Sequence, residues 1–127
     1  MTVLADAVPT LDVTFTFGDT WDDPTVTHTD ATSGLPISFV GYNLRMLIKA
    51  SYGATATLLT LDSATSGITI LDAAGGKWVW SATSVQTASL PLIGTSFPLV
   101  YTLTLYNAAS PQYDRTLLRG MLTVIAK

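Results

Sequence analysis

Apolar and polar side chains alternate strictly from residue 11 to residue 17, and this two-residue period constrains the fold more than any other feature of the chain. Successive side chains of a β-strand point to opposite faces, so the alternation predicts a strand with one buried and one exposed face. The same period returns at residues 42–49, where Leu47 alone breaks it, and at residues 99–106. The chain is therefore predicted to consist mainly of half-buried strands.

Turn-forming residues separate the predicted strands at intervals of about eight to twelve residues, the spacing expected of a β-sandwich. All nine acidic residues are Asp, which favours turns, and none is Glu, which favours helices. We therefore predict one all-β domain over residues 1–127, an immunoglobulin-like antiparallel β-sandwich of about seven strands in which residues 1–10 form an N-terminal arm. The further strands are predicted at residues 55–61, 68–71, 77–81 and 115–125.

The predicted core contains the apolar side chains that share one face of each strand. These are Leu11, Val13, Phe15, Phe17, Leu44, Met46, Ile48, Leu59, Trp78, Trp80, Leu103, Leu105, Leu122 and Val124. A helical turn is expected only at residues 84–90, with Ser84 as its N-cap and Pro91 at its end. Residues 18–34 are expected to form a long polar loop or a short irregular edge strand around Val26, and residues 107–112 a loop.

Composition excludes several classes of function. Cysteine is absent, so the chain has no disulfide and no thiolate chemistry. The net charge is −3 with only six basic residues, which argues against binding the phosphate backbone of a nucleic acid. Residues 1–10 lack the pattern of a secretory signal, and no segment is uniformly apolar enough to span a membrane as a helix. Synthesis in the cytoplasm without membrane insertion is therefore expected.

Candidate catalytic and ligand sites each have a simpler structural explanation. His28 is the single histidine, so a catalytic triad would have to use it, with Asp23 or Asp30 as the carboxylate. No nucleophile motif accompanies it, and a solvated loop histidine is therefore expected. A calcium ion could be held by Asp19, Asp22, Asp23 and Asp30, although turn-forming aspartates explain the same residues. The segment from Asp72 to Lys77 lacks the spacing of a phosphate loop and is predicted to be a hairpin turn. No enzyme activity, cofactor or metal is predicted.

Charged residues make up only 12% of the chain, so a large part of its surface is weakly charged. Either Ser and Thr replace the charges, or neighbouring subunits cover the surface. Aromatic residues are the natural anchors of such contacts, and the interface candidates are Trp21, Trp78, Trp80, Tyr106 and Tyr113. The group Trp78, Trp80, Tyr101 and Tyr106 could alternatively stack against a sugar.

Four segments together carry a resemblance to a known family. They are residues 15–21 (FTFGDTW), 41–48 (GYNLRMLI), 67–76 (GITILDAAGG), and 101–106 (YTLTLY) followed by 115–124 (RTLLRGMLTV). In this order they resemble the immunoglobulin-like N-terminal domains of bacteriophage baseplate upper proteins and tail-fibre attachment proteins. The segment from Leu90 to Pro98 departs from the compact turn usual there, and no fibre shaft or helix follows Val124.

The resemblance implies a non-enzymatic virion protein. It would be a docking or adaptor subunit of the tail, baseplate or fibre base that binds neighbouring virion proteins and copies of itself. The alternative is a capsid decoration domain or an adhesion domain that binds a glycan of the host surface, with residues 18–34 and exposed aromatic side chains as the working surface.

Overall fold

The structure is a computed structural model that describes residues 2–4, 9–107 and 109–127, with side chains described for residues 9–107, 109 and 115–127. Nine strands and one short helix form the described part of the chain. The elements are β1 (Thr2–Leu4), β2 (Val13–Thr16), β3 (Thr25–Thr29), β4 (Asn43–Lys49), β5 (Leu59–Asp62), β6 (Gly67–Asp72), β7 (Lys77–Ser81), α1 (Ser84–Ala88), β8 (Ser96–Asn107) and β9 (Ser110–Ile125). The predicted all-β class is confirmed.

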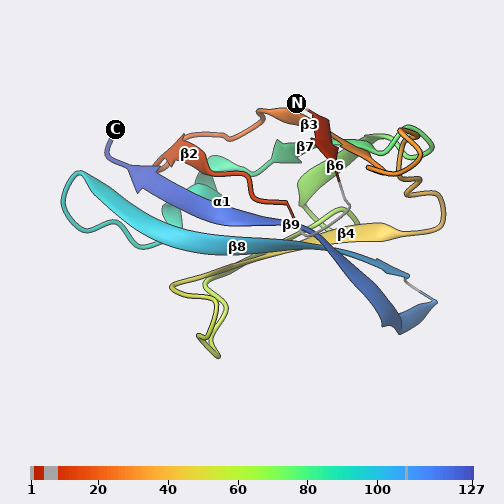
Figure 1. Cartoon of the computed structure of the whole chain (residues 1–127). Helices are drawn as coiled ribbons and strands as arrows, with labels where there is room; N and C mark the ends of the chain where they lie inside the picture. Colours follow the sequence, from red (N-terminus) through yellow and green to blue (C-terminus); the bar gives the residue numbers. More distant parts are fainter. Residues whose placement is uncertain (1, 5–8, 108) are drawn as a thin grey trace.

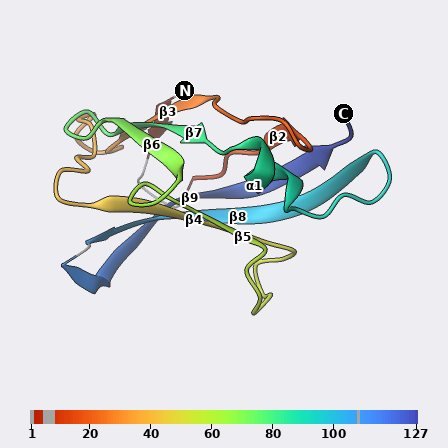
Figure 2. The ribbon, with the colours of Figure 1, turned by 180° about the vertical axis from the view of Figure 1, so that it is seen from behind.

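The strands form two layers joined along one side. Figures 1 and 2 show β3, β6 and β7 above β4, β8 and β9. The hydrogen-bonded order is β1-β3-β7-β6-β5-β4-β8-β9-β2, and β5 meets β6 through one residue pair, Asp62 with Gly67. The sheet therefore curls over on itself at β5, and its two terminal strands, β1 and β2, lie at the free edges.

The predicted antiparallel pairing does not hold at either end of the sheet or where β5 meets β6, since all three of these pairs are parallel. Strand β1 pairs with β3 in parallel, and β2 pairs with β9 in parallel. Parallel neighbours require a long crossover between them. For β2 and β9 that crossover is most of the chain, so a local sequence pattern contains no information about the pair.

The core lies between the layers and contains most of the predicted side chains. Alternate residues Leu44, Met46 and Ile48 of β4 are fully buried, as the period required. Of the predicted set, Leu11, Phe17 and Leu59 are only partly buried and pack against the rest. The core residues that the periodicity did not indicate include Val26, Phe39, Leu61, Ile68, Ala82, Leu90, Leu99 and Leu117.

Aromatic rings stack through the centre of the core. The Trp80 ring lies 4.6 Å from the Trp21 ring and 4.4 Å from the Trp78 ring, centroid to centroid. Phe15 continues the stack at 4.8 Å from Trp21. Such ring pairs add stabilisation beyond their buried area. The stack connects β2 to β7 across the two layers, so these residues link the edge strand to the centre of the domain.

The last strand shows why a strict two-residue period is interrupted. The register of β8 and β9 shifts between Leu103 and Thr104, which pair with Leu118 and Thr116. The extra residue, Leu117, marks a β-bulge, and both Leu117 and Leu118 are buried. Leu118, Gly120, Leu122 and Val124 of this strand are all buried, so the predicted core positions Leu122 and Val124 are confirmed. Strand β9 begins at Ser110, so the loop predicted over residues 107–112 is shorter than expected.

Helix α1 begins at Ser84, the residue predicted to be its N-cap, so the helix starts one residue earlier than expected. Thr83 is the N-cap, and its hydroxyl accepts a hydrogen bond from the Gln86 backbone N–H. The Gln86 side chain in turn accepts a hydrogen bond from the Thr83 backbone N–H, which completes a capping box. The helix is one turn long because Leu90 and Pro91 follow it directly. No helix within the described residues has the length and apolar character needed to cross a membrane.

One buried carboxylate ties three strands together. Asp62 of β5 is 6% exposed and accepts hydrogen bonds from the Tyr106 hydroxyl at 2.8 Å, the Arg45 Nε at 3.2 Å and the Ala64 N–H at 2.8 Å. The Arg45 guanidinium also lies 4.3 Å from the centroid of the Tyr106 ring. A buried carboxylate needs such donors, because desolvation without them is costly.

The Tyr106→Phe variant is expected to lose roughly 1–2 kcal/mol of unfolding free energy, because it removes one donor from a buried charge. The matched control is Tyr52→Phe. The Tyr52 hydroxyl donates to the Gly120 carbonyl, but the residue is 51% exposed, so water can replace the bond. Urea unfolding compares the two variants, and an equal loss in both would contradict the stabilising role of the Asp62 cluster.

Candidate docking site

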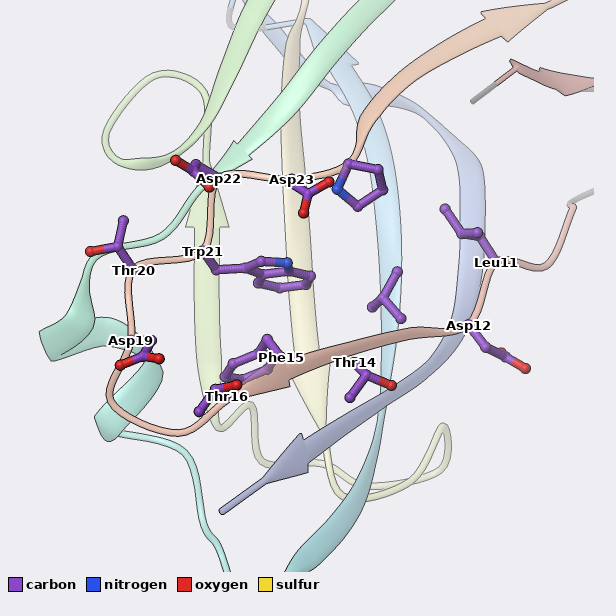
Figure 3. A pocket seen from close by; sticks show the side chains of 12 residues that line it. Leu11, Asp12, Thr14, Phe15, Thr16, Asp19, Thr20, Trp21, Asp22 and Asp23 are labelled. Atoms are coloured by element: carbon purple, nitrogen blue, oxygen red, sulfur yellow. The ribbon is translucent and has the colours of Figure 1, made fainter. Parts of the chain in front are cut away.

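A groove opens between the edge strand β2 and the segment that leads into β3. Its volume is about 400 Å³. Residues 11–16 form one wall and residues 19–24 the other. Figure 3 shows Phe15 and Trp21 between the two walls, with Asp23 on the wall opposite β2. The groove therefore lies on the side of the sandwich where the curled sheet remains open.

The groove has an apolar floor. Val13 is 9% exposed, Phe15 5% and Trp21 7%, so each contributes a small apolar surface. Trp21 is held in place by its backbone, whose N–H and C=O both pair with Ala82 at 2.9 Å. Phe15 stacks on Trp21 and Trp21 stacks on Trp80, so the floor rests on the aromatic core.

Strand β2 turns one row of its backbone groups toward the groove side. The N–H groups of Leu11 and Phe17 donate to the carbonyls of Arg119 and Ile125, so the odd-numbered residues of this segment face β9. Because both backbone groups of a residue point to the same side of a strand, the groups of Thr14 and the N–H of Thr16 point away from β9. The Thr16 carbonyl is occupied by the Asp19 N–H at 3.1 Å. Strand β2 is the last strand of the sheet, so nothing pairs with this row among the described residues.

The approach of β2 to β9 depends on Gly120. The Gly120 backbone lies against the Leu11 carbonyl so closely that a Cβ at this position would collide with it. On the same side, the Met121 N–H donates to the Asp12 carboxylate at 2.9 Å, and the Tyr101 hydroxyl donates to the Leu11 carbonyl. These contacts fix the start of β2 and leave its other edge free.

The rim of the groove is acidic. Asp12, Asp19, Asp22 and Asp23 line it, and Asp22 and Asp23 are exposed. One described cation is paired with the rim, since Lys127 Nζ lies 2.8 Å from Asp19 Oδ1. Four carboxylates against one ammonium group leave a negative potential over the opening. This potential favours a positively charged partner.

The calcium hypothesis finds no support in the arrangement of its residues. Asp30 lies apart from the groove, and its carboxylate accepts hydrogen bonds from the N–H groups of Thr32 and Ser33. These two backbone bonds lower the pKa of Asp30. No set of three or more ligand-type side chains within the described residues is placed to hold a metal ion. The turn-forming explanation is the one that the structure shows for Asp30.

Four of the five aromatic interface candidates, those whose side chains are described, lie in the core and not on the surface. Trp78 and Trp80 are fully buried, and Trp21 and Tyr106 are 7% and 8% exposed. The proposed interface role is therefore wrong for Trp78 and Trp80, because the domain's own second layer covers the face that they share. The sugar platform fails for the same reason, since Tyr101 is also buried. The side chain of Tyr113 lies outside the described residues.

His28 is buried, whereas the sequence predicted a solvated loop histidine. It lies on β3 with no exposed surface, and its Nε2 accepts a hydrogen bond from Trp78 Nε1 at 2.9 Å. An indole N–H can only donate, so the imidazole proton must lie on Nδ1. Nδ1 has no hydrogen-bond partner among the described groups. Burial, and secondarily the charge of Arg115, lower the pKa of His28 to about 4.

Sequence reasoning missed the groove because it depends on which strand is last in the sheet. The polar face of β2 was evident from Thr14 and Thr16, but the same pattern occurs in the central strand β8. A signal was nevertheless present in the sequence. The segment from residue 13 to residue 16 contains no charged residue and no Pro, the residue types that usually protect an edge.

Comparison with known proteins yields similarities to solved structures and no sequence family. No protein-family model matches the chain, and no curated protein matches it. Among solved structures, the chain is similar to the N-terminal domain of phage TP901-1 ORF48. The two share 11% sequence identity with a TM-score of 0.48, over 99% of this chain and 94% of that one.

Proposed function

We propose that this chain is a non-enzymatic structural protein of a bacteriophage or prophage particle. It would act as a docking subunit of the tail, baseplate or fibre base, and bind neighbouring virion proteins and further copies of itself. The phage context rests on the sequence resemblance described above. The docking role rests on the open side of the sandwich.

The observation that carries the docking role is the unprotected edge of β2. Soluble proteins usually protect a free edge with Lys, Pro or a bulge, or cover it, because an exposed edge pairs with other chains. Strand β2 (VTFT) has none of these residues, pairs with β9 without a bulge, and borders a groove with an apolar floor. An edge of this kind is free to pair with a strand of another subunit.

Exposed apolar side chains support the same role. Leu35 is 65% exposed, Val40 62% and Leu71 53%. They lie on two neighbouring segments, since the Phe39 N–H donates to the Ala73 carbonyl at 2.7 Å. Large apolar side chains exposed in adjacent segments are typical of surfaces that contact other proteins. The low content of charged residues reduces the desolvation cost of covering them.

The burial of His28 supports a role without catalysis. Its side chain has no exposed surface, so a substrate cannot reach the single imidazole of the chain. The buried Asp62 is likewise engaged by three donors. The aspartates of the groove are suited to electrostatic attraction, and the groove offers no nucleophile paired with a base.

The test is the composition of purified particles from the phage or prophage that encodes this chain. Quantitative mass spectrometry is expected to find the chain in a fixed ratio to the tail proteins, and immunogold labelling to place it at the tail. Absence from particles would contradict the proposal. In parallel, the purified chain is applied to a glycan array. Binding that depends on residues 18–34 would favour the adhesion alternative instead.

A further inference from the structure

We propose that the β2 edge accepts an extended, basic segment of a partner protein, which adds a strand to the sheet and closes the open side of the sandwich. This inference rests on the proposed docking function and specifies its site and its ligand. The binding mode is β-strand addition, in which backbone hydrogen bonds supply affinity and side-chain pockets supply selectivity.

The backbone of β2 provides the hydrogen bonds. The Thr14 N–H, the Thr14 carbonyl and the Thr16 N–H point away from β9 and form the groups that a new strand would pair with. Thr14 itself is exposed, so a partner can reach this position. An incoming strand would lie between β2 and the wall formed by residues 19–24, where the groove already provides the space.

The floor and the rim define the side chains of the ligand. Alternate side chains of an added strand would face Phe15 and Trp21, which favours small or medium apolar residues at every second position. The carboxylates of Asp22 and Asp23 would face the remaining or flanking residues, which favours Lys or Arg. The chain's own N-terminal arm does not fit this description, because residues 1–10 contain Asp6 and no basic side chain.

The probe is an acetylated and amidated peptide of alternating lysine and valine, about six residues long, the usual length of a strand. The control peptide has glutamate in place of lysine. We expect the lysine peptide to bind the full chain with an affinity that falls as salt increases, and to slow hydrogen exchange at the Thr14 and Thr16 amides in NMR spectra. The glutamate peptide should bind at least about tenfold more weakly.

A proline variant tests the edge itself. Thr14→Pro removes the N–H that faces the groove but none of the bonds to β9, so the variant should fold with a nearly unchanged melting temperature. Its affinity for the lysine peptide should fall at least about tenfold, because the ring also blocks the pairing. Thr14→Val keeps the N–H and the β-branched shape and should bind like the parent chain. Replacing Asp22 and Asp23 together with Asn should weaken the salt dependence of binding.

Several outcomes would overturn the inference. They are equal binding of the two peptides, unchanged exchange at Thr14 and Thr16, or full binding by the Thr14→Pro variant. Protection of these amides that rises with protein concentration in the absence of peptide would show that a second copy occupies the edge instead. These outcomes leave the proposed function standing if particles contain the chain. Peptide binding by a chain that is absent from particles would overturn the function and leave the edge site standing.

Discussion

The Trp80→Ala variant is expected to lose about 4 kcal/mol of unfolding free energy, in the range measured for large aromatic truncations in protein cores. Trp80 is fully buried and contacts three other rings, those of Trp21, Trp78 and Tyr101. Its removal leaves a cavity between the two layers that strands on either side cannot fill without losing their pairing. Urea unfolding followed by circular dichroism measures the loss.

The control for this variant is Val85→Ala. Val85 lies on α1 and is 78% exposed, so its truncation should change the unfolding free energy by less than about 0.5 kcal/mol. A Trp80→Ala loss as small as that of Val85→Ala would contradict the two-layer core. Because Trp21 stacks on Trp80, the Trp80→Ala variant should also perturb the groove. It is therefore unsuitable for testing peptide binding.

Acid is expected to destabilise the domain through His28. Its pKa falls from an ordinary value of 6.5 in the unfolded chain to about 4 in the folded chain, so folding favours the neutral imidazole. Above pH 6.5 the imidazole is neutral in both the folded and the unfolded chain, and the contribution of His28 to the unfolding free energy is fully present. As the pH falls from 6.5 toward 4 the unfolded state binds the proton first, and about 3 kcal/mol is lost. Below about pH 4 the folded state is protonated too and this contribution ends.

His28→Gln separates this effect from the titration of carboxylates. A Gln side chain can accept the hydrogen bond from Trp78 Nε1 but does not titrate. Urea unfolding of both proteins at several pH values between 4 and 7 should show that the unfolding free energy falls more steeply with decreasing pH in the parent chain than in the variant. Parallel curves would mean that His28 does not carry the acid sensitivity.

The strands that could be predicted are those whose burial repeats locally. Residues 43–49 and 115–125 were recognised because one face of each strand meets the core along its length. Residues 55–58 were assigned to a strand on propensity alone, yet β5 begins only at Leu59. Tertiary context decides such segments, because β-propensity mainly reflects packing against neighbours. For the same reason the sequence predicted at most a short irregular strand around Val26, and it did not predict that Val26 and His28 are both buried on one face of β3.

The site could not be predicted because it is a property of topology. Trp21, Trp78 and Trp80 attract attention in a sequence as interface residues, but a strand aromatic belongs to the core whenever a second layer covers it. The groove depends instead on β2 pairing with β9 across more than one hundred residues, for instance Val13 with Leu122. Only the folded arrangement shows that Thr14 lies at a free edge, and only there do Asp22 and Asp23 line the same groove as Thr14.

The central claim is that the open side of the sandwich is covered when the protein is in its particle. The direct measurement is hydrogen–deuterium exchange, read by mass spectrometry, of the segment from Leu11 to Pro24 in the purified chain and in intact particles. The account predicts rapid exchange at Thr14 and Thr16 in the free protein and strong protection in the particle. Equal exchange in the two states would show that no neighbour pairs with this edge.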